Sequence, residues 1–268
     1  MPIVNGQYVS PTWQNGGPPP IDQTELQAIT DTLASLDAGG GGGDGKRYAR
    51  FVIGTSTNGW TSADCDYLCD GTDDQVEINA AIAAFGSLSG GNAGHGTIVL
   101  LDGNYHLTAP LTLLNHINLV GSGGACLIRE TDAGTSSYNI MVSVQFGTID
   151  NIQYTISESL PRPQSETIEI LLGGNSSIKN CNIYDYLYTA IAIESGSWAG
   201  TCVVANNYFG YSKNSQYAMD VHVLDSQNFI IENNYLNYGV RVDRGPSASL
   251  STFSISNNSM GTTVVGQI

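Results

Sequence analysis

Basic side chains are scarce in this chain of 268 residues, which has 9 lysines and arginines against 24 aspartates and glutamates. The formal net charge of −15 at pH 7 repels the phosphates of nucleic acids and the surface of anionic membranes. We therefore predict no nucleic-acid partner and no membrane partner. Neutral glycans and other proteins fit this charge better than anionic glycans do.

Long hydrophobic runs are also missing from the sequence. No segment approaches the ~20 apolar residues that a membrane-spanning helix needs, and residues 1–5 lack the basic and apolar regions of a signal peptide. We therefore expect the protein to be made in the cytoplasm of the cell that produces it.

Cysteine is sparse as well, with five residues at irregular spacings. An odd count without a second cysteine pair or a histidine cluster does not suit a zinc site, so we predict reduced thiols, no metal and no cofactor. A bridge or a shared metal between Cys65 and Cys69 is the alternative. The sequence does not decide whether the five aspartates around this cysteine pair bind calcium; they are Asp64, Asp66, Asp70, Asp73 and Asp74.

A short phrase, Ile or Val followed two residues later by Asn, recurs five times in the second half of the chain. Its asparagines, 29, 26, 27 and 24 residues apart, are Asn151, Asn180, Asn206, Asn233 and Asn257. Such a period is typical of a coil whose turns stack as parallel strands. Asparagine at a fixed bend can hydrogen-bond its own turn and the next, so we predict an asparagine ladder. Three residues further on, we expect an inward column of Tyr154, Ile183, Phe209, Leu236 and Met260.

These repeats resemble the right-handed parallel β-helix of the pectate-lyase-like superfamily over about residues 47–268. The resemblance implies an all-β fold, a right-handed single-stranded parallel β-helix with an N-terminal capping helix. Residues 70–74 read as a turn and residues 75–84 as that helix, with apolar positions at Val76, Ile78, Ile82 and Phe85. In the family such a helix covers the open end of the coil, where strand edges would otherwise be exposed.

The first 38 residues have a different character from the rest. Pro18, Pro19 and Pro20 favour an extended arm, and a short helix follows whose apolar seam is Leu26, Ile29, Leu33 and Leu36. A seam of two heptads is not stable alone and needs a partner, either copies of itself or a groove on another protein. Packing against its own β-helix is the alternative. We predict an anchoring and oligomerisation segment at 1–38, a glycine-rich linker at 39–46 and the β-helix domain at 47–268.

This opening, with Tyr8, Trp13 and residues 15–19, resembles the N-terminal anchoring segments of phage and prophage structural proteins. Residues 51–56 and 64–71 are similar to the start of β-helix proteins encoded in prophages of intestinal bacteria. The resemblance implies a virion appendage of the tail-spike or head-fibre type, made in the host cytoplasm. It also implies a homotrimer that attaches to other virion proteins through residues 1–38. Its expected task is particle decoration or attachment to host surface glycans.

A depolymerase is the alternative function, because polar residues fall on neighbouring turns. Aligning residues 190–192, 220–222 and 239–241 places Ile191, Val221 and Val240 inward. The candidates for acid/base catalysis or anion recognition are then Asp220, His222 and Arg241, with Glu194 and Asp243 nearby. Such a site would serve a glycoside hydrolase or a polysaccharide lyase. A solvated polar face without catalysis is the simpler interpretation, and a bacterial adhesin is a third.

Tyrosines outnumber phenylalanines by 14 to 6 and gather late in the chain. We predict that Tyr208 and Tyr235 form one column and that Tyr211 and Tyr238 form another. Rings with polar tips suit contacts with sugars or proteins. The candidate contact residues are Tyr184, Tyr186, Tyr208, Tyr211, Tyr235 and Tyr238. A seam between subunits and ordinary turn packing are the alternatives.

Overall fold

The structure, a computed structural model, describes residues 3–4, 7–8, 49–89, 93–131, 140–158, 160, 167–194, 200–212, 217–223, 228–244 and 252–260. The chain divides into two compact units, Met1–Arg47 and Tyr48–Ile268. In the first unit, β1 (Ile3–Val4) pairs antiparallel with β2 (Gln7–Tyr8). The predicted seam of Leu26, Ile29, Leu33 and Leu36 and the glycine-rich linker lie outside the described residues.

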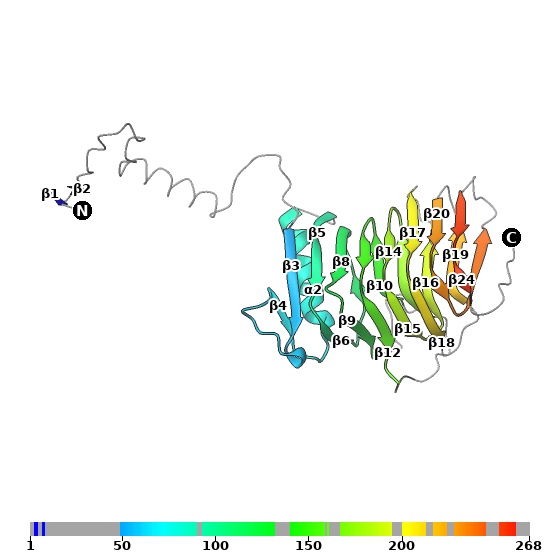
Figure 1. The fold of residues 1–268 in the computed structure, drawn as a ribbon, viewed down its shortest axis with the longest axis horizontal. Helices are drawn as coiled ribbons and strands as arrows, with labels where there is room; N and C mark the ends of the chain where they lie inside the picture. The colour runs from blue at the N-terminus through cyan, green and yellow to red at the C-terminus, as the bar shows by residue number, and fades with distance from the viewer. Residues whose placement is uncertain are drawn as a thin grey trace, which may run out of the picture. The chain divides into compact units, whose positions relative to one another are not determined.

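The second unit is a parallel β-helix built from three sheets. Each strand pairs in parallel with the equivalent strand of the neighbouring turn, and Figure 1 shows these strands following one another along the coil. The described part is nearly all β, with one α-helix, so the predicted fold class is confirmed. The six-stranded sheet contains β7 (Leu111–Thr112), β10 (Ile140–Gln145), β13 (Ile168–Gly173), β16 (Thr189–Glu194), β19 (Tyr217–Val223) and β22 (Gly239–Arg244).

The other two sheets run along the same coil. The nine-stranded sheet contains β4 (Tyr67–Cys69), β3 (Ala49–Thr55), β5 (Ala93–Leu100), β8 (Asn115–Gly121), β11 (Thr148–Asp150), β14 (Ser177–Lys179), β17 (Thr201–Ala205), β20 (Asn228–Glu232) and β23 (Phe253–Ser256). The seven-stranded sheet contains β6 (Gly103–Leu107), β9 (Ala125–Arg129), β12 (Gln153–Ile156), β15 (Asn182–Tyr186), β18 (Tyr208–Ser212), β21 (Tyr235–Leu236) and β24 (Ser259–Met260).

Apolar columns fill the inside of the coil. In the seven-stranded sheet, Tyr154, Ile183, Phe209, Leu236 and Met260 pair in register, which confirms the predicted inward column. The first four are at most 1 % exposed, whereas Met260 in the last described turn is 37 % exposed. Each side chain buried in this way stabilises the fold by roughly 1.5–3 kcal/mol.

The helix α2 (Gln75–Ser89) packs against the first turn of the coil, next to β3, β5 and β7. Its buried face consists of Ile78, Ala81, Ile82 and Phe85. Val76, predicted to be part of this face, is instead 59 % exposed. Two residues along a helix correspond to a rotation of about 200°, so Val76 and Ile78 lie on opposite sides.

The five aspartates before α2 hold this first turn together. The two carboxylate oxygens of Asp74 accept hydrogen bonds from the backbone N–H groups of Gly71 (2.8 Å) and His106 (2.7 Å). Asp64 accepts from the backbone N–H of Thr61, and Asp66 accepts from that of Val52. Asp70 accepts from the backbone N–H of Thr72, and Asp73 accepts from the hydroxyl of Thr108. These bonds give the acidic cluster a structural role at the start of the coil.

The predicted asparagines occupy the bends between the nine-stranded and seven-stranded sheets. All five have φ between 54° and 58°, the left-handed region that asparagine tolerates better than most residues. The backbone N–H groups of the first four bond to the next turn, as from Asn180 to the carbonyl of Ala205 (3.2 Å). The side chains are exposed, and those of Asn151 and Asn180 bond to the preceding turn, as predicted, at the carbonyl of Gly121 (3.0 Å) and Asp150 Oδ1 (2.8 Å).

The stacked amides of the ladder belong to the residues that follow these asparagines. Asn207 Nδ2 donates to the carbonyl of Ile178 (3.1 Å) and to Asn234 Oδ1 (3.0 Å), while Asn207 Oδ1 accepts from the N–H of Cys181 (2.9 Å). Asn234 makes the same pattern of bonds with Asn258. The internal ladder is therefore shifted by one residue from the predicted positions and contains three asparagines in the described chain.

Replacing Asn207 with leucine should lower the free energy of unfolding by about 2–4 kcal/mol, because the N–H of Cys181 and the carbonyl of Ile178 would be left unpaired inside the coil. Equilibrium unfolding in urea measures this change. The neighbouring substitution Asn206→Gly is the control, since glycine accepts a φ of 58° and an exposed side chain is lost. Equal losses from both variants would contradict the assignment of the ladder to Asn207.

Candidate functional site

Four tyrosines form a strip on the outer face of the seven-stranded sheet, which we call the tyrosine strip. Phe209 and Leu236 point into the coil, so their neighbours Tyr208 and Tyr235 point outward on adjacent turns. Tyr184 of β15 continues the strip. Tyr211 of β18 is included for its exposed side chain, although it lies two residues from the inward Phe209 and the strand alternation does not place it. Tyr184, Tyr211 and Tyr235 are 42 %, 66 % and 40 % exposed.

Ring stacking fixes the geometry of the strip. The rings of Tyr208 and Tyr235 are stacked, with centroids 5.2 Å apart and planes 8° apart. The ring of Tyr184 is tilted by 53° against Tyr208 at 6.1 Å. Stacked rings cover each other's faces, so Tyr208 and Tyr235 offer mainly ring edges and hydroxyl groups to a ligand. Tyr211 offers the largest exposed ring area of the strip.

Two predicted members of the tyrosine surface lie elsewhere. Tyr186 is fully buried, although residues two apart in a straight strand face the same side and Tyr184 is exposed. The alternation therefore breaks between these residues, where β15 reaches the corner of the coil. Tyr238 packs edge-on against the buried ring of Tyr186, with centroids 6.3 Å apart, whereas Tyr211 is 66 % exposed, so the two rings point to different surroundings. Contact between Tyr186 and a glycan is therefore ruled out by burial.

The catalytic candidates lie on the last three strands of the six-stranded sheet. Glu194, His222 and Asp243 are register partners on β16, β19 and β22, and Asp220 is the register partner of Arg241. The column predicted through Val221 is wrong, because Met219 pairs with Ile191 and Val240. The predicted register of β19 is displaced by two residues. Because side chains alternate with a period of two, the predicted inward and outward positions of the strand are unchanged. The side chains of Glu194, Asp220, His222 and Asp243 lie outside the described part of the chain.

A buried charged cluster joins three successive turns at the corner between the seven-stranded and six-stranded sheets. Arg129 Nη1 donates to Glu169 Oε2 (2.8 Å), Tyr154 donates to the same oxygen, and the N–H of Leu187 donates to Glu169 Oε1 (2.8 Å). Arg129, Tyr154 and Glu169 are at most 1 % exposed. Burial and the neighbouring Glu169 carboxylate both raise the pKa of Tyr154, which stays protonated as a donor.

The sequence analysis did not predict this cluster, although the sequence contains one indication of it. Glu169 is the single charge within the apolar run of residues 168–172, and a charge in such a run needs a buried partner. Burial lowers the pKa of Arg129 and the Glu169 carboxylate raises it, with a net increase, so the guanidinium stays charged. Because both carboxylate oxygens are bonded and no atom of the side chain reaches solvent, the cluster is structural rather than catalytic.

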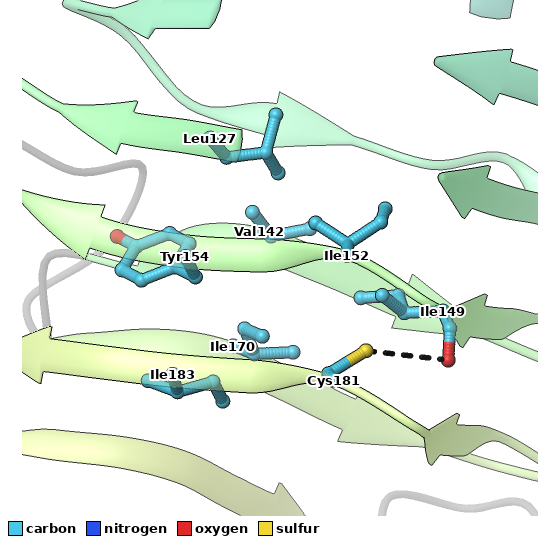
Figure 2. Close-up of a pocket in the computed structure, with 8 residues that line it drawn as sticks. All are labelled: Leu127, Val142, Ile149, Ile152, Tyr154, Ile170, Cys181 and Ile183. Carbon is cyan, nitrogen blue, oxygen red and sulfur yellow. Dashed lines mark hydrogen bonds between the residues drawn. The ribbon is translucent and has the colours of Figure 1, made fainter. Parts of the chain in front are cut away.

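A small cavity of about 10 Å³ lies inside the coil. Figure 2 shows the side chains that line it, which are Leu127, Val142, Ile149, Ile152, Tyr154, Ile170, Cys181 and Ile183. A volume of this size holds one water molecule at most. Its lining is almost entirely apolar, with the thiol of Cys181 directed at the carbonyl of Ile149 (4.0 Å, dashed line in Figure 2). This cavity is therefore too small and too apolar to bind a glycan.

Among the described residues, Cys69, Asp74 and Glu77 form a group close enough to share a metal ion. Burial, and then the charge of Asp74, raise the pKa of the Cys69 thiol well above its usual value, which keeps the thiol protonated and a poor ligand. Both oxygens of Asp74 already accept backbone hydrogen bonds. The group thus fits a closed helix start better than a metal site. All five cysteines are unpaired.

Within the described residues, no helix has the length and apolar character required to cross a membrane. No family model and no curated protein matches the chain. Among solved structures, a provisionally assigned glycosyl hydrolase from Parabacteroides merdae ATCC 43184 is similar, with a TM-score of 0.54 and 12 % identity over 81 % of this chain and 99 % of that one. At this identity the similarity shows the fold alone.

Two further structures are similar at a lower level. The A-module of the mannuronan C-5 epimerase AlgE6 from Azotobacter vinelandii has a TM-score of 0.26 and 14 % identity, covering 74 % of this chain and 75 % of that one. The ORF18 protein of Geobacillus virus E2 has the same TM-score and identity, covering 98 % of this chain and 67 % of that one. Both TM-scores are too low to support a common fold or function.

Substituting phenylalanine for Tyr186 should leave stability unchanged or raise it by up to about 1 kcal/mol, because its buried hydroxyl has no hydrogen-bond partner among the residues that the structure describes. The matched substitution Tyr154→Phe should lower the free energy of unfolding by about 1–3 kcal/mol, since Glu169 would lose a donor inside the core. Thermal or urea unfolding of both variants measures the difference. A larger loss for Tyr186→Phe than for Tyr154→Phe would contradict the two assignments.

Proposed function

We propose that this protein is a virion appendage that uses the tyrosine strip to contact glycans on the surface of a host cell. The exposed, ordered tyrosines are the observation that carries the proposal. They lie on strands of a rigid coil, where spacing and orientation are fixed before a ligand arrives. Attachment to the virion is assigned to residues 1–38, in line with the resemblance of this segment to phage anchoring segments.

The chemistry around the strip suits a neutral glycan. Asn182 and Gln153 continue the column of Tyr208 and Tyr235 on the two preceding turns, so hydroxyl and amide groups line up along the coil. Successive turns are about 4.8 Å apart, close to the size of one sugar unit. Amide and phenol groups can donate to and accept from sugar hydroxyls. A net charge of −15 favours neutral over anionic chains.

The combined substitution Tyr211→Ala and Tyr235→Ala should weaken binding to host cells about tenfold or more, because each lost aromatic contact contributes about 0.5–1.5 kcal/mol. Binding of the fluorescently labelled full chain to intact host cells and to purified neutral surface polysaccharide measures this loss. The control is Val76→Ser, which removes an exposed apolar side chain on α2. Unchanged binding in the double variant, with binding present in the parent protein, would reject the strip as the contact surface.

A polysaccharide depolymerase is the second candidate function. The fold similarity to a provisionally assigned glycosyl hydrolase favours it, as does the register of Glu194, His222 and Asp243 on adjacent strands. Glycoside hydrolysis uses two carboxyl groups about 5–10 Å apart, and the strands of Glu194 and Asp243 lie two turns apart, about 10 Å at ~4.8 Å per strand. Incubation with host glycans, followed by reducing ends and by absorbance of unsaturated products, separates the two functions. Release that is abolished by Asp220→Asn, Glu194→Gln or Asp243→Asn would favour the enzyme over the non-cleaving appendage.

A further inference from the structure

The alternation of side chains in the seven-stranded sheet changes where the tyrosine strip begins. On β12, Thr155 alone lies between two buried side chains. At the equivalent place on β15, both Tyr184 and Asp185 lie between the buried side chains of Ile183 and Tyr186. Two residues opposite one form a β-bulge, which redirects side chains and bends the strand. The strand β15 therefore turns two consecutive side chains toward the outer surface.

The next strand, β18, follows the same path. Asp185 is the register partner of Tyr211. Gly210 precedes Tyr211, and a Cβ at Gly210 would clash with the carbonyl oxygen of Tyr184, so the two bulged backbones lie in close contact. The bulge thus accounts for the outward position of Tyr211, which is 66 % exposed and lies beside Asp185 on the adjacent turn.

The bulge also places one charge in the tyrosine strip. Asp185 is the only charged residue on the strands β12, β15, β18, β21 and β24 of this sheet. Its side chain is half-exposed, and Asp185 Oδ2 accepts a hydrogen bond from the hydroxyl of Thr155 (3.3 Å). This bond orients the carboxylate. A carboxylate has about four acceptor sites, so a ligand can share it with Thr155.

A carboxylate is more selective than the other polar groups of the strip. Phenol and amide groups both donate and accept hydrogen bonds, whereas an ionised carboxylate only accepts. Asp185 therefore requires a ligand that donates, and it repels an acidic sugar. Two hydroxyl groups on adjacent carbons of a sugar ring can each donate to one carboxylate oxygen, and bonds to an ionised acceptor are stronger than neutral ones. A single ammonium group would form a partly exposed ion pair, which contributes little.

We propose that Asp185 selects sugars with two adjacent free hydroxyl groups, while the ring of Tyr211 stacks against the same sugar. The backbones of the two residues are about 4.8 Å apart across the register pair, so one sugar unit can contact both side chains. A sugar without such a pair leaves the carboxylate covered but without a donor, which lowers its affinity. The inference rests on the proposed function and names the residue that sets the specificity of the tyrosine strip.

The substitution Asp185→Asn tests the role of the carboxylate, because asparagine keeps the shape and one acceptor but replaces the other oxygen with a donor. Binding of the labelled full chain to purified neutral surface polysaccharide of the host should weaken about tenfold or more. Asp185→Ser, which adds no amide, should cause a similar loss. Glu232→Gln is the control, since it removes the same charge from a half-exposed position of the nine-stranded sheet and should bind like the parent. Melting temperatures show that the variants are folded.

Periodate tests the ligand, because it cleaves the carbon–carbon bond between adjacent hydroxyl groups. Polysaccharide treated with periodate and then reduced with borohydride remains uncharged but lacks these pairs. The parent protein should bind the treated polymer about tenfold or more weakly than the untreated one. Asp185→Asn should distinguish the two polymers less than about threefold, because the group that reads the hydroxyl pair is gone.

Equal binding by the parent and both Asp185 variants would overturn the proposal and leave the tyrosine strip, which Tyr211→Ala with Tyr235→Ala tests separately. Equal weakening by Glu232→Gln would attribute the effect to net charge. An equal periodate loss in the parent and Asp185→Asn would show that the hydroxyl pairs are read elsewhere. Binding that is lost at high salt in the parent alone would identify an ammonium group as the ligand. A parent that binds no polysaccharide rejects the proposed function together with this inference.

Discussion

The parallel hydrogen bonding of each turn to the next is the constraint on which every surface of this protein depends. Once Ile183, Phe209 and Leu236 pair in register, Tyr184, Tyr208 and Tyr235 are brought together on the outside by strand alternation alone. A slip of one residue would turn the interior outward. Core packing and the outer columns are therefore two results of the same pairing.

The bend between two of the sheets keeps that pairing in register. An asparagine with positive φ follows each of the five strands of the nine-stranded sheet from β11 to β23, and Asn207, Asn234 and Asn258 bond the inner side of the last three of these bends. In the two preceding turns Ile152 and Cys181 occupy the same inner position. The inner position of the bend is therefore occupied by hydrogen-bonded asparagines in the later turns and by apolar side chains in the earlier ones. Both arrangements are compatible with the same strand register.

The parts that could be predicted from the sequence are those with constant spacing. The strand that follows each asparagine bend begins two residues after the asparagine. The repeat was therefore sufficient to place Tyr154, Ile183 and Phe209 in the core. The six-stranded sheet follows loops of variable length, with 28 residues from Ile191 to Met219 and 21 from Met219 to Val240. The alignment made from the sequence therefore placed Val221 at the position that Met219 occupies. Burial of Tyr186 depends on a corner, and the pairing of Arg129 with Glu169 joins residues 40 apart, so neither follows from a local pattern.

The inward-facing side chains are covered at one end of the described coil and partly exposed at the other. The first turn is covered by α2, whereas Ile255 and Met260 in the last described turn are 47 % and 37 % exposed. Each turn is held mainly by its two neighbours, as in other repeat architectures. Among the described turns, this one therefore opens at the lowest cost in free energy, and the amides of Asn207 and Asn234 hold the turns before it.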